Sequence, residues 1–145
     1  MCDALRRVAA RVLGHLEALA LVYDSQHWQF AHGYSGHLLF DRLRAETRED
    51  LDTWYEVLPF RAPSAAHRAR IALAVLQAQE EPMELEAALL VELDEMIDQG
   101  ERAQLGGTRQ QCLELQGMLN LAAEAAEKHA HRLLILRRSF AHEVA

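Results

Sequence analysis

The chain has 145 residues, of which 50% are hydrophobic, and 22 acidic against 15 basic residues give it a formal charge of −7 at neutral pH. This length predicts a single domain, residues 1–145, that can bury a sizeable core. Only seven glycines and three prolines occur, which favours an all-helical protein. The acidic balance and the lack of a basic tail argue against nucleic-acid binding, because that binding depends on neutralising phosphates.

The first predicted element is a helix over residues 3–32. It is amphipathic and charged residues interrupt its sequence, so it lacks the continuous apolar core of a signal peptide and is too polar to cross a membrane. The two cysteines, Cys2 and Cys112, match neither a metal-binding spacing nor a disulfide framework. We therefore expect a cytoplasmic protein without a membrane partner. The stripe repeats at three-, four- and seven-residue intervals and consists of Leu5, Val8, Val12, Leu16, Leu19, Tyr23 and Phe30.

A short break is predicted at Gly33 and Gly36, since glycines in a helical pattern favour a turn. The second predicted helix follows over residues 37–58. It ends at Pro59, which has no N–H group to continue the helical hydrogen bonds.

Three more helices are predicted, one short and two long. The short helix covers residues 65–79 with Ser64 as its N-cap. The first long helix covers about residues 83–105 and ends at two glycines. The second begins after the capping residue Thr108 and runs to about residue 141. Four long amphipathic helices bury their apolar stripes most simply as a four-helix bundle. The short helix between the second and third long ones predicts a ferritin-like bundle with one crossover.

Candidate metal ligands form two pairs on the second predicted helix: His37 with Asp41, and Asp52 with Glu56. At 100° per residue all four lie within a sector of about 100°, away from the apolar residues. Asp41 and Asp52 are nevertheless about 16 Å apart along the axis, whereas one metal ion needs donors at about 2.0–2.5 Å. One chain alone cannot close such a site, but two antiparallel copies across a two-fold axis can. The alternative interpretation is a solvated charged face, because acidic residues four apart are common.

The stretch QHWQFAHGYSGHLLFDRLRAETREDLDTWYE, residues 26–56, resembles the signature of the Dps family, the miniferritins. In that family a His-Trp pair late in the first helix precedes the pattern H-x3-D-x10-D-x3-E in the second. Here the pair is His27-Trp28, and the two ligand pairs fit the pattern without a gap. The tail from residue 106 to residue 134 is also similar to the fourth helix of the family.

This resemblance implies a ferroxidase centre shared by two subunits of a hollow dodecamer. One chain would contribute His27, His37 and Asp41, and its two-fold mate would contribute the ligands of the second pair, Asp52 and Glu56. Trp28 would lie beside the centre and take part in electron transfer to peroxide. The implied activity is oxidation of ferrous iron by hydrogen peroxide and storage of the ferric product. Carboxylate and imidazole ligands also suit zinc or manganese.

The sequence departs from the family pattern in ways that favour a second interpretation. His27 and His37 are ten residues apart where about twelve is usual, and Val57 stands where the family has an arginine. A non-catalytic ferritin-like shell or a metal buffer is therefore the alternative function. A third hypothesis is a dimer of bundles in which the charged face only holds the interface.

Other candidate sites receive less support from the sequence. No Glu-x-x-His motif of the kind that builds a di-iron site inside one ferritin bundle is present. The last predicted helix carries Glu127 and His131 at chelating spacing, but the cluster formed by these two with Glu124 and His129 is more typical of a solvated face. Trp54 is predicted to pack in the core. Four further side chains fit apolar stripes and are predicted to fill the core or an interface: Met83, Met96, Cys112 and Met118.

Overall fold

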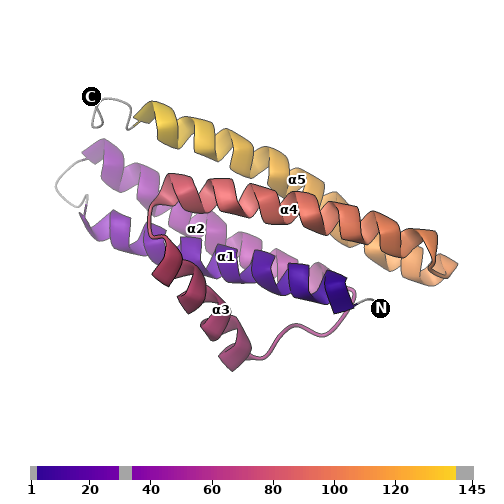
Figure 1. Ribbon diagram of the computed structural model, residues 1–145. Helices are drawn as coiled ribbons and strands as arrows, with labels where there is room; N and C mark the ends of the chain where they lie inside the picture. The colour runs from indigo at the N-terminus through magenta and orange to yellow at the C-terminus, as the bar shows by residue number, and fades with distance from the viewer. Residues whose placement is uncertain (1–2, 30–33, 140–145) are drawn as a thin grey trace.

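The computed structural model of this protein describes residues 3–29 and 34–139, and within these ranges it is helical with no strand. The all-helical prediction is confirmed. No helix in the described ranges has both the length and the apolar character that crossing a membrane requires. The helices, shown in Figure 1, are α1 (Asp3–Gln29), α2 (Tyr34–Val57), α3 (Ala65–Ala78), α4 (Pro82–Leu105) and α5 (Arg109–Ser139).

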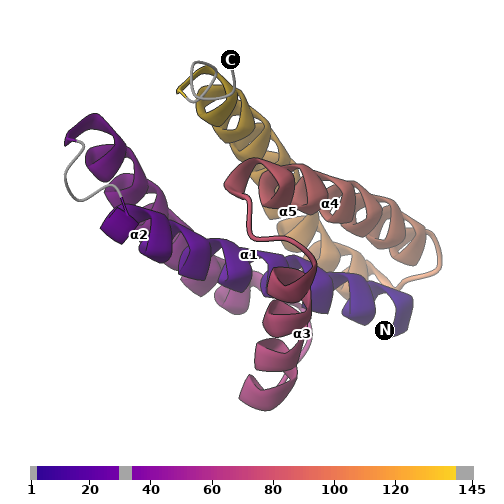
Figure 2. The same cartoon turned by 60° about the vertical axis from the view of Figure 1, so that its left-hand side comes forward.

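The four long helices form two antiparallel pairs, α1 with α2 and α4 with α5 (Figure 1). The pairs meet mainly where α1 packs against α4, while α2 and α5 share a smaller contact. The helix α3 lies in the link between the pairs, packs against α1, and returns the chain so that α4 runs in the same direction as α2. Figure 2 shows the two pairs spreading apart toward the end where α1 stops and α2 starts.

Local capping explains where α3 and α5 begin. The Ser64 hydroxyl accepts a hydrogen bond from the backbone N–H of His67 at 3.2 Å. At the start of α5, the Thr108 hydroxyl accepts from the Gln111 N–H at 3.2 Å, and the Gln111 side chain accepts from the Thr108 N–H at 2.9 Å. These reciprocal bonds satisfy N–H groups that a helix start leaves without partners. Both predicted caps are confirmed.

The predicted break before α2 is partly wrong. The helix begins at Tyr34 and includes Gly36, so His37 is its fourth residue rather than its first. A glycine inside a helix costs about 1 kcal/mol relative to alanine, which weakens a helix without ending it. Gly33 and the predicted stripe residue Phe30 lie outside the described residues.

The core follows the predicted stripe of α1. All six described stripe residues are buried, and so are Trp54, Met96 and Met118. Met83 and Cys112 are only half-buried. Because α1 contacts α2, α3 and α4, residues outside the stripe such as Leu13 are buried as well. Gly14 marks the close approach of α3, since a Cβ atom there would lie 2.1 Å from Cγ2 of Ile71.

Candidate metal centre

The end of α1 and the start of α2 bring three of the predicted ligands together. His27, in the last turn of α1, is 5% exposed, and its ring centroid lies 4.2 Å from that of His37. Its Nδ1 atom is 3.4 Å from the backbone carbonyl oxygen of His37 and 3.9 Å from Oδ1 of Asp41. If Nδ1 carries the proton and donates to this carbonyl, Nε2 keeps the lone pair that a metal ion would use.

The ring of His37 contains a buried nitrogen with an unmet hydrogen-bonding capacity. Its Nδ1 atom is buried and has no hydrogen-bond partner among the described residues. A buried polar atom without a partner costs about 1–3 kcal/mol, so such atoms are usually satisfied by a ligand, an ion or water. The imidazole therefore fits a metal-binding role.

Asp41, the third of these residues, is held by an arginine that the sequence analysis did not single out. Nη2 of Arg44 donates to Oδ1 of Asp41 at 3.0 Å, and Nη1 of the same guanidinium donates to Oδ1 of Asp24 at 2.9 Å. The hydrogen bond to Asp24 raises the pKa of Arg44 above its usual value. Asp24 precedes His27 by three residues on α1, and residues three apart share one face of a helix.

Trp28 lies beside this group on the protein surface. Its side chain is 66% exposed, and its ring meets the His27 ring edge-on with a centroid distance of 5.1 Å. The predicted place of Trp28 beside His27 is therefore confirmed, while its role in electron transfer stays a prediction.

The structure does not bring Asp52 and Glu56 to the same place. Both are exposed and lie toward the far end of α2. For a rise of about 1.5 Å per residue, Asp52 is about 16 Å and Glu56 about 22 Å from Asp41 along the axis. Among the described residues of one chain, no group of three or more His, Cys, Asp and Glu side chains is arranged to hold a metal ion. Completion of the centre by a second chain stays a prediction.

The sequence predicted that a cluster of acidic and histidine side chains on α5 faces solvent, and this is wrong for His129. Glu124, Glu127 and His131 are exposed, but His129 is 1% exposed and its Nδ1 lies 2.6 Å from Oε2 of Glu86. Its spacing already indicated burial, because His129 follows the buried Ala122 and Ala125 at helical intervals of seven and four residues.

Glu86 on α4 is the centre of this buried cluster. Its carboxylate, which is 0% exposed, accepts a hydrogen bond from the Tyr23 hydroxyl and pairs with Nη1 of Arg132 at 3.6 Å. Arg132 also reaches Glu46 on α2 at 3.1 Å. Burial, followed by the negative charge of Glu86, raises the pKa of Tyr23 above its usual value. Because three donors surround the carboxylate and one of them is cationic, this cluster suits a structural role better than a metal site.

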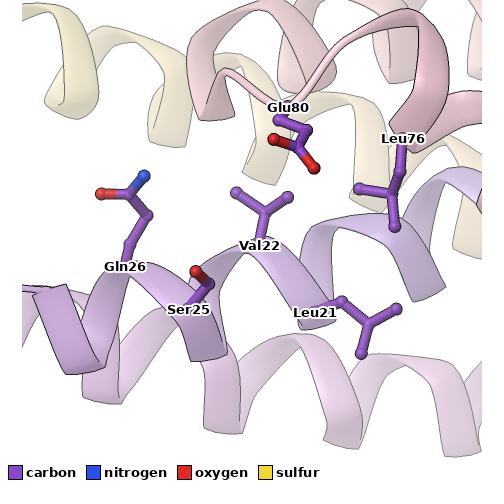
Figure 3. A pocket seen from close by; sticks show the side chains of 6 residues that line it. All are labelled: Leu21, Val22, Ser25, Gln26, Leu76 and Glu80. Atoms are coloured by element: carbon purple, nitrogen blue, oxygen red, sulfur yellow. The ribbon is translucent and has the colours of Figure 1, made fainter.

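Two pockets flank α3 rather than the histidine pair. Figure 3 shows the smaller one, about 150 Å³, where Leu76 and Glu80 face Leu21, Val22, Ser25 and Gln26 of α1. The larger one, about 410 Å³, lies between α1, α2 and α3 and is mostly apolar, with Glu17 and Arg48 among its lining residues. Neither is lined by an imidazole, so neither fits the predicted centre.

Comparison of the chain with family models, curated proteins and solved structures finds no match. The arguments for function therefore come from the motif and from the geometry described above.

Proposed function

We propose that this protein is a miniferritin of the Dps type, which oxidises ferrous iron and stores the ferric product. The observation that carries the proposal is the first half-site, where the end of α1 and the start of α2 bring His27 next to His37 and Asp41. The second half-site, Asp52 and Glu56, remains exposed on the same helix, where another subunit can reach it.

The path of the chain supports a ferritin-like bundle as the finer description of the fold. In Figure 1, α1 and α5 run one way while α2 and α4 run the other, and the link that contains α3 provides the crossover. Ferritin-like bundles have one long crossover of this kind. We further propose that two copies pair through α2 across a two-fold axis, and that twelve copies form a hollow cytoplasmic shell whose acidic surface attracts cations.

Ferrous ions are substrates in this proposal. His27, His37 and Asp41 of one subunit would face Asp52 and Glu56 of its mate, giving imidazole and carboxylate donors for two ions. Each ferrous ion gives up one electron, and one hydrogen peroxide molecule takes both electrons and two protons to form two water molecules. The exposed Trp28 lies against His27 and would serve as an electron carrier. Zinc or manganese could occupy the same donors, and zinc would not undergo this reaction.

A ferritin-like shell without ferroxidase activity is the second candidate function. The pairing of Asp41 with Arg44 favours this alternative, because a carboxylate that already holds a cation is a poorer metal ligand. A ferroxidase assay separates the two candidates. We expect about two ferrous ions per chain to bind anaerobically and a peroxide pulse to oxidise them faster than in buffer, in particles near the mass of twelve chains.

Mixed assemblies test whether the centre is built across chains. His37→Ala and Glu56→Ala chains should each be inactive, and shells re-formed from equal amounts of both should regain about one quarter of the wild-type sites. Half of randomly formed dimers contain one chain of each kind, and one of the two sites in such a dimer is intact. Asp94→Ala, which removes an exposed carboxylate of α4, is the control and should retain full activity. Verified mixed shells without any recovery would contradict the shared centre.

A further inference from the structure

The guanidinium of Arg44 links α1 and α2 at the mouth of the first half-site. It bridges Asp24 at 2.9 Å and Asp41 at 3.0 Å, and all three side chains are partly exposed, at 29% for Arg44, 38% for Asp24 and 51% for Asp41. The Asp41 oxygen that pairs with Arg44 is the same Oδ1 atom that lies 3.9 Å from Nδ1 of His27. The positive charge of Arg44 therefore lies next to the Asp41 oxygen that is nearer to His27.

A metal ion on Asp41 would compete with this guanidinium. A metal ion bound by a carboxylate oxygen lies at about 2.0–2.5 Å from it. The Arg44 nitrogen is at 3.0 Å from that oxygen, so two like-charged centres would lie within a few ångströms of each other. Their repulsion is strong at this separation even when it is partly screened by water.

We propose that Arg44 is the counter-cation of the metal-free half-site, neutralising Asp24 and Asp41, and that metal binding displaces it from Asp41. The inference rests on the proposed metal centre and makes Arg44 a positioning residue that determines its affinity. Asp24 gives the displaced guanidinium a second carboxylate on which to remain, and so it is a partner of Arg44 rather than a metal ligand. In this way the chain keeps its carboxylates paired until a divalent ion arrives.

The opposite role for Arg44 predicts the opposite result. If the guanidinium only held Asp41 in a productive orientation, then removing it would loosen the carboxylate and weaken metal binding. If it competes with the metal, removing it strengthens binding. The sign of the change in affinity therefore distinguishes the two roles.

The test is a titration of the metal-free, full-length protein with Co²⁺, followed through the visible absorption of the bound ion. We expect Arg44→Gln to lower the dissociation constant by about tenfold or more, because one positive charge leaves the immediate surroundings of a divalent ion. Arg44→Lys, which keeps the charge, should stay closer to the wild type. The matched control is Arg42→Gln, which removes the same charge from an exposed arginine paired with Glu46 at 3.7 Å. It should change the constant less than about threefold.

His27→Ala identifies the site, since only binding that this variant abolishes belongs to the centre. Equal or weaker binding by Arg44→Gln, with normal binding by the wild type, would overturn the role of Arg44 and leave the metal centre standing. An absence of His27-dependent binding in both proteins would overturn the centre and the inference together. Tighter binding by Arg44→Gln without peroxide-driven iron oxidation would support the inference and refute the ferroxidase.

Discussion

The substitution Glu86→Ala removes a carboxylate of α4 that binds side chains of α1 and α5. In the native chain it binds the Tyr23 hydroxyl, His129 and Arg132 in a position that is 0% exposed. Alanine would leave the hydroxyl and the imidazole without partners, at about 1–3 kcal/mol each. Breaking a buried ion pair costs about 3–5 kcal/mol. This cost partly includes that of the unpaired groups, because both arise from loss of the same carboxylate. We therefore expect a loss of about 3–6 kcal/mol, a large part of the 5–15 kcal/mol typical of a domain.

Urea unfolding followed by far-ultraviolet circular dichroism measures this loss. Tyr23→Phe removes a single hydrogen bond to a carboxylate and should cost about 1.5–3 kcal/mol. Glu84→Ala, at an exposed position of the same helix, should change stability by no more than about 0.5 kcal/mol. Replacing Tyr23, Glu86, His129 and Arg132 together by Phe, Met, Leu and Met should restore most of the stability, because well-packed apolar side chains can substitute for a buried ion cluster.

The reasoning fails if Glu86→Ala costs less than about 1 kcal/mol with an unchanged dependence on urea concentration. Such a result would mean that Glu86 is not the shared partner of Tyr23, His129 and Arg132. A quadruple variant that is as unstable as Glu86→Ala would show instead that the cluster cannot be exchanged for apolar packing.

Two further predictions concern packing and pH. Gly14→Ala should destabilise by about 1–3 kcal/mol in the same urea assay, because the new Cβ would lie 2.1 Å from Ile71; Gly117→Ala, at an exposed helical site with room for a methyl group, should stabilise instead. Burial and then the hydrogen bond to Glu17 raise the pKa of Tyr55 to about 12, so the folded chain keeps a proton that the unfolded chain loses near pH 10. Stability from this group is complete below about pH 10 and disappears as the pH rises through 12. Between about pH 10 and pH 12, the Tyr55→Phe variant should therefore lose less stability than the wild type. Equal losses of stability in the two proteins would contradict the raised pKa of Tyr55.

Local sequence patterns were sufficient to predict the helices and to place the two members of each ligand pair on one helix face. The stripe of α1, the cap at Ser64 and the reciprocal bonds at Thr108 depend on residues within a few positions of one another. The same holds for His37 with Asp41, since residues four apart share a helix face whatever the rest of the fold does. For this reason the sequence predicted the elements and the two halves of the candidate centre.

Contacts between helices were decided only by the tertiary structure. Periodicity shows that a residue faces inward, but it does not show which residue of another helix it meets. The pairing of His129 with Glu86 and the bridge from Arg44 to Asp24 join positions 43 and 20 residues apart, and neither follows from a local rule. The sequence by itself determined which side chains share a helix face. The packing of the helices determined which of those faces meet. The physical reason is that the free energy of burying one apolar face depends on how every other helix is placed.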